Sequence, residues 1–79
     1  MKVYCSRIKS LRKKAGLTQK QLGTIIGYSH TAVSDWENGL KQPGADAIIL
    51  LAKTFGESAD YILGLEDEDG HKTTDRENI

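Results

Sequence analysis

The chain has 79 residues, of which 38% are hydrophobic, and its net charge is zero. A chain of this length forms one small domain that buries only about 60% of the surface of its unfolded state, which excludes a large catalytic cleft between two lobes. The zero charge conceals an asymmetry: residues 1–41 carry +6, residues 42–65 carry −2 and residues 66–79 carry −4. A basic first half followed by an acidic end favours a polyanionic partner.

The first predicted helix spans residues 3–15. Four apolar residues recur at the spacing of one helix face: Tyr4, Ile8, Leu11 and Ala15. Basic residues fill its last turns, where they interact favourably with the helix dipole. Gly16 follows, and a glycine at this place is typical of a helix end.

The second predicted helix is Gln19–Ile26. Thr18 and Gln21 have the spacing of a capping box, which marks the start of a helix. The predicted apolar face consists of Leu22, Ile25 and Ile26. Gly23 lies in the middle of this helix, where glycine costs about 1 kcal/mol relative to alanine. We expect that Gly23 is there to allow the next helix to approach closely.

The third predicted helix spans residues 30–38, with Ser29 as its N-cap. It follows the second after only the turn 27–29, and two short helices joined by a short turn with glycine indicate a helix-turn-helix unit. On a helical wheel, the buried face holds Ala32, Val33 and Trp36. The opposite face carries short polar side chains: His30, Thr31, Ser34 and Asn38, with Asp35 at its edge. Such a face suits a helix that contacts bases in a DNA groove.

Two further helices are predicted at Ala45–Phe55 and Ala59–Leu63, the second with Ser58 as its N-cap. The core face of the longer helix holds Ile48, Leu51, Ala52 and Phe55. Its Ile49 and Leu50 then point outward. The residues predicted to form a dimer interface are Leu50, Tyr61, Ile62 and Leu65.

No segment alternates between apolar and polar residues, so the predicted fold class is all-α, with five helices in a domain at residues 1–65. From residue 66 onward the sequence is acidic and has only one apolar residue, Ile79. Such a segment does not offset its ordering entropy, so we expect residues 66–79 to form an acidic, disordered tail. This tail keeps the protein in solution, binds a protein partner or shields the protein's own basic surface.

Several functions are excluded by what the sequence lacks. Its longest apolar run, 47–52, is too short for a membrane span of roughly 20 residues, and its start lacks the apolar region of a signal peptide. A single cysteine, Cys5, excludes an internal disulfide and favours a cytoplasmic location. Cys5, His30 and His71 fall short of a zinc site, so we expect no metal and no cofactor. On a convex helix, His30 and Ser34 have no pocket for catalysis, so we expect no enzyme activity.

A set of residues in fixed order runs through positions 6–64: Arg12, Leu17-Thr18-Gln19, Leu22-Gly23, Gly27, Val33 and Trp36-Glu37-Asn38-Gly39. In this order and spacing, the chain resembles the lambda-repressor-like helix-turn-helix family of phage and bacterial regulators. The resemblance implies five helices and binding to double-stranded DNA, usually as a homodimer. It also implies a structural ion pair between Arg12 and Glu37.

The resemblance assigns further roles by position. It implies that four residues contact bases: His30, Thr31, Ser34 and Asp35. It implies that four others contact the DNA backbone: Gln19, Ser29, Asn38 and Lys41. From the charge pattern we add Lys13 and Lys20 to the backbone contacts. The chain departs from the family where glutamine is common, at His30 and Thr31, and an acidic Asp35 at a DNA surface points to a cytosine N4 contact or a bridging water.

The sequence therefore predicts a sequence-specific transcriptional regulator whose third helix enters the major groove of a pseudo-palindromic operator. Repression by occluding polymerase is the favoured role, and the sequence leaves activation open. One alternative is an antitoxin that represses its own operon and binds its toxin through the acidic tail. Another alternative is a protein-interaction module that does not bind DNA.

Overall fold

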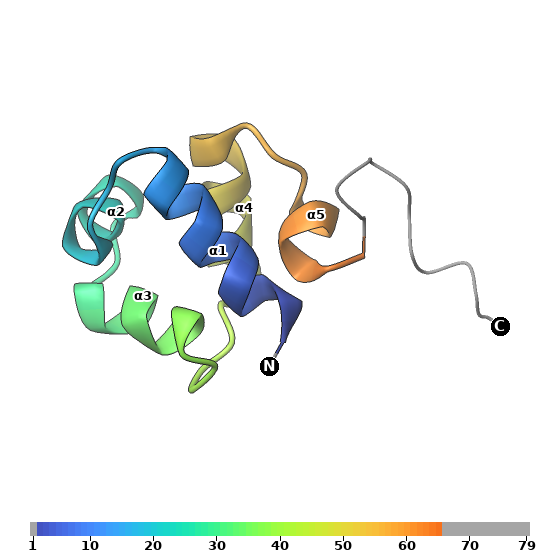
Figure 1. Ribbon diagram of the computed structural model, residues 1–79, viewed down its shortest axis with the longest axis horizontal. Coiled ribbons are helices and arrows are strands. Elements are labelled where there is room, and N and C mark those ends of the chain that lie inside the picture. Colours follow the sequence, from blue (N-terminus) through green and yellow to red (C-terminus); the bar gives the residue numbers. More distant parts are fainter. Residues whose placement is uncertain (1, 66–79) are drawn as a thin grey trace, which may run out of the picture.

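A computed structural model describes residues 2–65, which form five helices and contain no strand (Figure 1). The helices are α1 (Val3–Lys14), α2 (Gln19–Ile26), α3 (His30–Glu37), α4 (Ala45–Phe55) and α5 (Ala59–Leu63). The predicted fold class and the number of helices are confirmed. The acidic segment 66–79 lies outside the described residues, so the predicted boundary at residue 65 and the disordered tail remain predictions.

Side-chain caps fix where the helices begin. The Thr18 hydroxyl accepts from the Gln21 N–H at 3.0 Å, and the Gln21 side chain accepts from the Thr18 N–H at 2.8 Å, so the predicted capping box is present. Ser29 and Ser58 cap α3 and α5 in the same way, through the N–H groups of Ala32 and Tyr61. Each cap satisfies a backbone donor that the first turn of a helix leaves unpaired.

Two helices end one residue earlier than predicted. Ala15 and Asn38 are the C-cap residues of α1 and α3 rather than their last helical residues. Ala15 is also exposed instead of buried, because α1 has already ended where Ala15 would join its apolar face.

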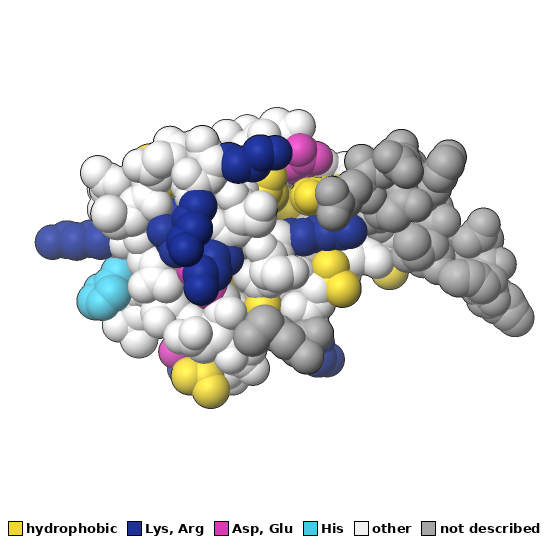
Figure 2. Space-filling view, in the orientation of Figure 1, with side chains coloured by type: hydrophobic (Ala, Val, Ile, Leu, Met, Phe, Trp, Pro, Cys, Tyr) yellow, Lys and Arg dark blue, Asp and Glu magenta, His cyan; other side chains and the backbone are white. Residues whose placement is uncertain are grey.

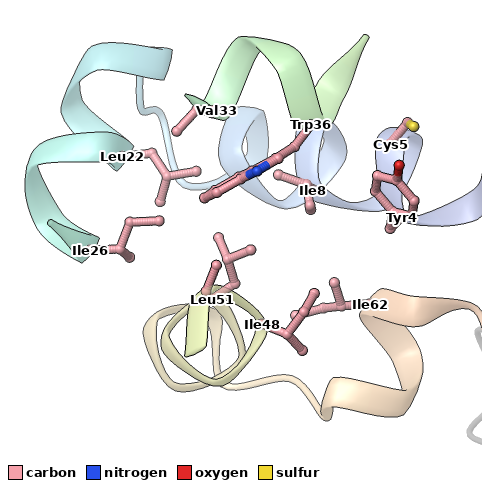
Figure 3. Close-up of a cluster of buried hydrophobic side chains, with 11 residues drawn as sticks. Tyr4, Cys5, Ile8, Leu22, Ile26, Val33, Trp36, Ile48, Leu51 and Ile62 are labelled. Carbon is pink, nitrogen blue, oxygen red and sulfur yellow. The ribbon is translucent and has the colours of Figure 1, made fainter. Parts of the chain in front are cut away.

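The core draws apolar side chains from all five helices (Figure 3). Its buried members are Tyr4, Cys5, Ile8, Leu22, Ile26, Val33, Trp36, Ala47, Ile48, Leu51 and Ile62. The indole of Trp36 reaches into the middle of this cluster, toward Leu22 and Leu51 (Figure 3). The ring of Tyr28 meets it edge-on, with 5.2 Å between ring centroids. Tyr28 lies in the turn between α2 and α3, and Trp36 lies in α3. Their ring contact therefore links the core to the angle between α2 and α3.

The predicted burial of two residues is wrong. Ile25 is 55% exposed on the outside of α2, because the turn packs against Gly23 and shifts the buried face of α2 away from Ile25. Ile62 has no exposed surface and belongs to the core, so it is not available for a dimer interface. The sequence analysis also missed Ala47, which is fully buried in α4.

Helix α5 closes the bundle against the first turns of α1. The Arg7 guanidinium lies 4.1 Å from the centre of the Tyr61 ring and donates a hydrogen bond to the Tyr61 carbonyl. At the end of α5, a Cβ added to Gly64 would lie only 2.9 Å from Cβ of Val3. The start of α1 and the end of α5 are therefore in contact. None of the helices within residues 2–65 has the length and apolar character needed to cross a bilayer.

Candidate nucleic-acid interface

The turn between α2 and α3 is packed against the middle of α2. The Tyr28 N–H donates to the Gly23 carbonyl at 2.8 Å. A Cβ on Gly23 would lie 2.4 Å from the Tyr28 carbonyl oxygen, far inside van der Waals contact. The close approach expected at Gly23 is thus present, but its partner is the turn rather than the third helix. Gly27 ends α2 with a φ of 80°, a left-handed conformation that glycine adopts without steric cost.

Helix α3 is held from its inner side and is open on its outer side. Val33 and Trp36 are buried, as predicted. We call five residues the outer face of α3: His30, Thr31, Ser34, Asp35 and Asn38. Of these, His30, Thr31 and Asn38 are exposed, whereas Ser34 and Asp35 are partly buried. Among residues 2–65, α3 packs against α1 and α2, and Figure 1 shows no helix on the side of α3 that faces away from α1.

Three of the polar residues on this face have intramolecular partners. The Asn38 amide nitrogen donates to the Ser34 hydroxyl at 3.1 Å. The Asp35 carboxylate lies 4.0 Å from the ammonium group of Lys41, whose side chain is 77% exposed against 19% for Asp35. Lys41 therefore offsets part of the negative charge that Asp35 places on the outer face of α3.

A buried ion pair ties α1 to the end of α3. Nε and Nη2 of Arg12 donate to the two carboxylate oxygens of Glu37 at 2.7 and 3.0 Å, in a bidentate geometry. Both residues are buried, and the hydrogen bond to Glu37 raises the pKa of Arg12 above its usual range. The ion pair that the family resemblance implied is confirmed.

The same ion pair also holds the start of α2. Nη1 of Arg12 donates to the Leu17 carbonyl at 2.8 Å, and the Gln19 amide nitrogen donates to Glu37 at 3.1 Å. Gln19 is thus only partly free for the DNA-backbone contact predicted for it. One carboxylate fixes the relative positions of three helices, and with them the outer face of α3.

The basic side chains predicted to contact phosphates are exposed. Lys13 and Lys20 lie on the surface of α1 and α2. Within residues 2–65, the ion pairs are Arg12–Glu37 and Lys41–Asp35, so neither lysine is neutralised by an acid there. Figure 2 shows a group of Lys and Arg side chains over α1, on the side where α1 faces α3. Among the described residues, no three His, Cys, Asp or Glu side chains lie close enough to hold a metal ion.

The predicted dimer residues are only partly brought together. Leu50 and Leu65 are 38% and 39% exposed. Tyr61 is half-buried beneath Arg7, and Ile62 lies in the core. Two other exposed apolar residues, Ile49 and Leu63, line a shallow surface groove between α4 and α5. The sequence analysis placed Ile49 on the outside of its helix but missed Leu63 and the groove that the two residues share.

The geometry defines a helix-turn-helix unit with an open third helix, and comparison with known proteins agrees. The sequence model described as "Helix-turn-helix" matches residues 8–62. Over 77 residues, 98% of this chain and 68% of the relative, the chain is 38% identical to the uncharacterized HTH-type transcriptional regulator YobD of Bacillus subtilis. It is 37% identical over 57 residues to antitoxin PezA of Streptococcus pneumoniae, covering 72% of this chain and 36% of the antitoxin.

Among solved structures, the chain is similar to the phage P22 c2 repressor protein in complex with a synthetic operator. The TM-score is 0.75 at 33% identity, over 80% of this chain and 96% of that chain. This chain belongs to the lambda-repressor-like helix-turn-helix family of DNA-binding transcriptional regulators. It spans 68% of YobD but only 26% of the full P22 repressor protein C2 of a Salmonella phage.

Proposed function

We propose that this protein is a sequence-specific regulator of transcription that inserts α3 into the major groove of its operator. The observation that carries the proposal is the outer face of α3, which is open to solvent while Val33 and Trp36 anchor the helix from within. The major groove of B-DNA, about 12 Å wide, admits an α-helix. The hydroxyl, imidazole and carboxylate groups of His30, Thr31, Ser34 and Asp35 are then the groups that contact base edges.

Contacts to phosphates fix the register of α3 in the groove. We assign them to polar and basic groups on α1, α2 and the residues flanking α3, all exposed except the partly buried Gln19: Lys13, Gln19, Lys20, Ser29, Asn38 and Lys41. Each phosphate neutralised by a lysine releases counterions, so log K falls against log salt with a slope of about −0.9 per phosphate. Binding that does not weaken with salt would contradict these assignments.

We further propose that two copies bind a pseudo-palindromic operator. The apolar groups available for pairing are Leu50 and Leu65, together with the exposed Ile49 and Leu63. Two helix-turn-helix units on one face of the duplex contact half-sites about 34–36 Å apart. Such a complex represses a promoter by excluding polymerase from the same DNA.

The experiment that tests this function is selection of bound sequences from a random DNA pool with the full chain. A selected two-fold symmetric site supports the proposal, and a pool that stays random overturns it. Thr31→Ala is then expected to relax preference at one base pair, worth about 1–3 kcal/mol. Lys13→Ala is the matched control, because it weakens binding to all sequences alike.

A second candidate function is that of an antitoxin. Two observations favour it: the similarity to antitoxin PezA and the net charge of −4 in residues 66–79, which suits a basic protein partner. Here too the helices bind DNA, and the acidic segment binds the toxin. Co-purification of a small basic protein encoded beside this one supports the antitoxin role. Unaltered growth when that neighbouring gene is expressed alone overturns it.

A further inference from the structure

Asn38 and Ser34, on the outer face of α3, are joined twice. The Asn38 amide nitrogen donates to the Ser34 hydroxyl oxygen at 3.1 Å. The Asn38 backbone N–H donates to the Ser34 carbonyl at 2.9 Å. The side-chain contact is therefore supported by a backbone bond between the same two residues.

The buried end of α3 fixes the position of Asn38. Trp36 and Glu37, which precede it, are each only 4% exposed. Gly39, which follows it, has a φ of 75° and donates its N–H to the Trp36 carbonyl at 3.3 Å. The Asn38 amide is thus presented from an anchored turn rather than from a frayed helix end.

The contact with Asn38 determines what the Ser34 hydroxyl can offer to a partner. A hydroxyl has one proton to donate and two lone pairs that accept. At Ser34, one lone pair is occupied by the Asn38 amide. Among residues 2–65, no group accepts the Ser34 proton. With a donor on the Asn38 side, this proton points elsewhere and is available to an acceptor outside the protein.

We propose that Asn38 is a positioning residue that sets Ser34 as a hydrogen-bond donor to a base, an inference that rests on the DNA-binding function proposed above. In the major groove, guanine, adenine and thymine each present an acceptor, whereas cytosine presents only its N4 donor. A Ser34 hydroxyl that donates its proton toward the DNA therefore disfavours cytosine at the position that Ser34 contacts. Asn38 acts through Ser34 and needs no base contact of its own.

The test measures base preference, as ratios of Kd between operators that differ at one base pair. The starting operator is the one selected by the full chain. Ser34→Ala identifies the base pair in question, where it is expected to reduce the preference by about 2- to 12-fold, the net value of one hydrogen bond. Asn38→Ala is expected to reduce the preference at that same base pair. The double variant is expected to show no further loss beyond Ser34→Ala.

Asn38→Asp keeps almost the same side-chain shape but replaces the amide donor that faces Ser34 by a carboxylate acceptor. An ionised aspartate only accepts, so it draws the Ser34 proton toward itself and leaves a lone pair facing the base. The preference at that base pair is then expected to shift toward cytosine, whatever the added charge does to overall affinity. The matched control is Thr31→Ala, which is expected to alter a different base pair.

Distinct outcomes separate failure of this inference from failure of the proposed function. If Asn38→Ala lowers affinity for every operator by the same factor and leaves the ratio at the Ser34 base pair unchanged, Asn38 serves only the backbone contact assigned to it above and the positioning inference is wrong. If Ser34→Ala changes no base preference, the inference is also wrong, although DNA binding stands. If the wild-type chain selects no sequence, the proposed function and this inference fall together.

Discussion

At the scale of single residues, Gly23 shows how the lack of a side chain sets the helix-turn-helix geometry. The Tyr28 carbonyl occupies the space in which a Cβ would lie, so the turn can fold back onto α2 only at a glycine. The sequence shows that a glycine at this position lowers the stability of the helix, but it does not identify Tyr28 as the residue that packs there. Contacts between a turn and a helix depend on tertiary packing, which periodicity does not report.

Gly23→Ala is expected to destabilise the fold even though alanine is the better helix former. The gain in helix propensity is about 1 kcal/mol. Overpacking against backbone atoms costs about 1–3 kcal/mol, because the Tyr28 carbonyl is not the end of a flexible side chain. Urea unfolding measures the difference. Thr24→Ala, at the exposed neighbouring position, is the control and is expected to change stability little.

Tyr4 gives the fold a pH dependence at the alkaline end. Its hydroxyl donates to the Lys41 carbonyl at 3.4 Å, and burial, followed by the neighbouring Cys5, raises the pKa of Tyr4 above its ordinary value of 10.0. The unfolded chain therefore loses this proton before the folded protein does. The stability that depends on neutral Tyr4 is complete below pH 10 and is lost as the pH rises through the folded pKa.

The measurement is the urea midpoint between about pH 9 and about pH 11, on either side of the ordinary tyrosine pKa. We expect the wild-type midpoint to fall more steeply with pH than that of Tyr4→Phe, which has no proton to lose. Parallel curves for the two proteins would show that Tyr4 titrates alike in the folded and unfolded states.

At the scale of helices, the Arg12–Glu37 pair determines how α1, α2 and α3 fit together. Removing one partner of a buried pair leaves an uncompensated charge, which typically costs about 3–5 kcal/mol. Arg12→Met is therefore expected to lower the free energy of unfolding by about that amount in urea titrations. Lys13→Met, at the next and exposed position, is the control and is expected to change it by less than about 0.5 kcal/mol.

A double variant separates the charge from the packing. Arg12→Met with Glu37→Leu replaces both buried charges by apolar groups, and such replacements are often neutral or stabilising. We expect it to recover most of the stability lost in Arg12→Met. A double variant as unstable as the sum of its single variants would show that the two residues contribute independently.

The helices that the sequence predicted well are those with strong local signals. Thr18, Ser29 and Ser58 fixed the starts of three helices because caps depend on near neighbours in the chain. Errors arose where long-range packing decides burial. Ile25 looks apolar and in phase, yet α2 is covered on one side only, and Ile62 looks like a surface residue, yet it fills the core between α1 and α4.

The candidate site shows the same division. Val33 and Trp36 could be placed inward by periodicity, and the outer face of α3 followed from that placement. The partners of Asn38 and Gln19 could not be foreseen, because they depend on rotamers and on where a second helix ends. Family resemblance supplied the Arg12–Glu37 pair, which residue spacing alone does not contain.

At the scale of the whole molecule, exposed apolar residues gather on α4 and α5. Ile49 lines a surface groove with Leu63 and another with Leu50. We expect two copies to pair through this surface, so sedimentation velocity at micromolar concentration is expected to show a dimer. Leu50→Lys is expected to raise the Kd of that dimer by about 10-fold or more, which corresponds to about 1.4 kcal/mol or more. Ile25→Lys, an equally disruptive change on α2, is expected to leave it intact. A wild-type chain that stays monomeric even on palindromic DNA would contradict this.

Val3 and Gly64 bring the two ends of the five-helix bundle to one place on its surface. The polypeptide enters and leaves the bundle side by side, which is the arrangement that tolerates insertion into another protein or relocation of the chain ends. A short linker between residues 65 and 3 therefore spans the junction without distorting α1 or α5. The five-helix bundle can therefore be joined to another protein at this one place on its surface.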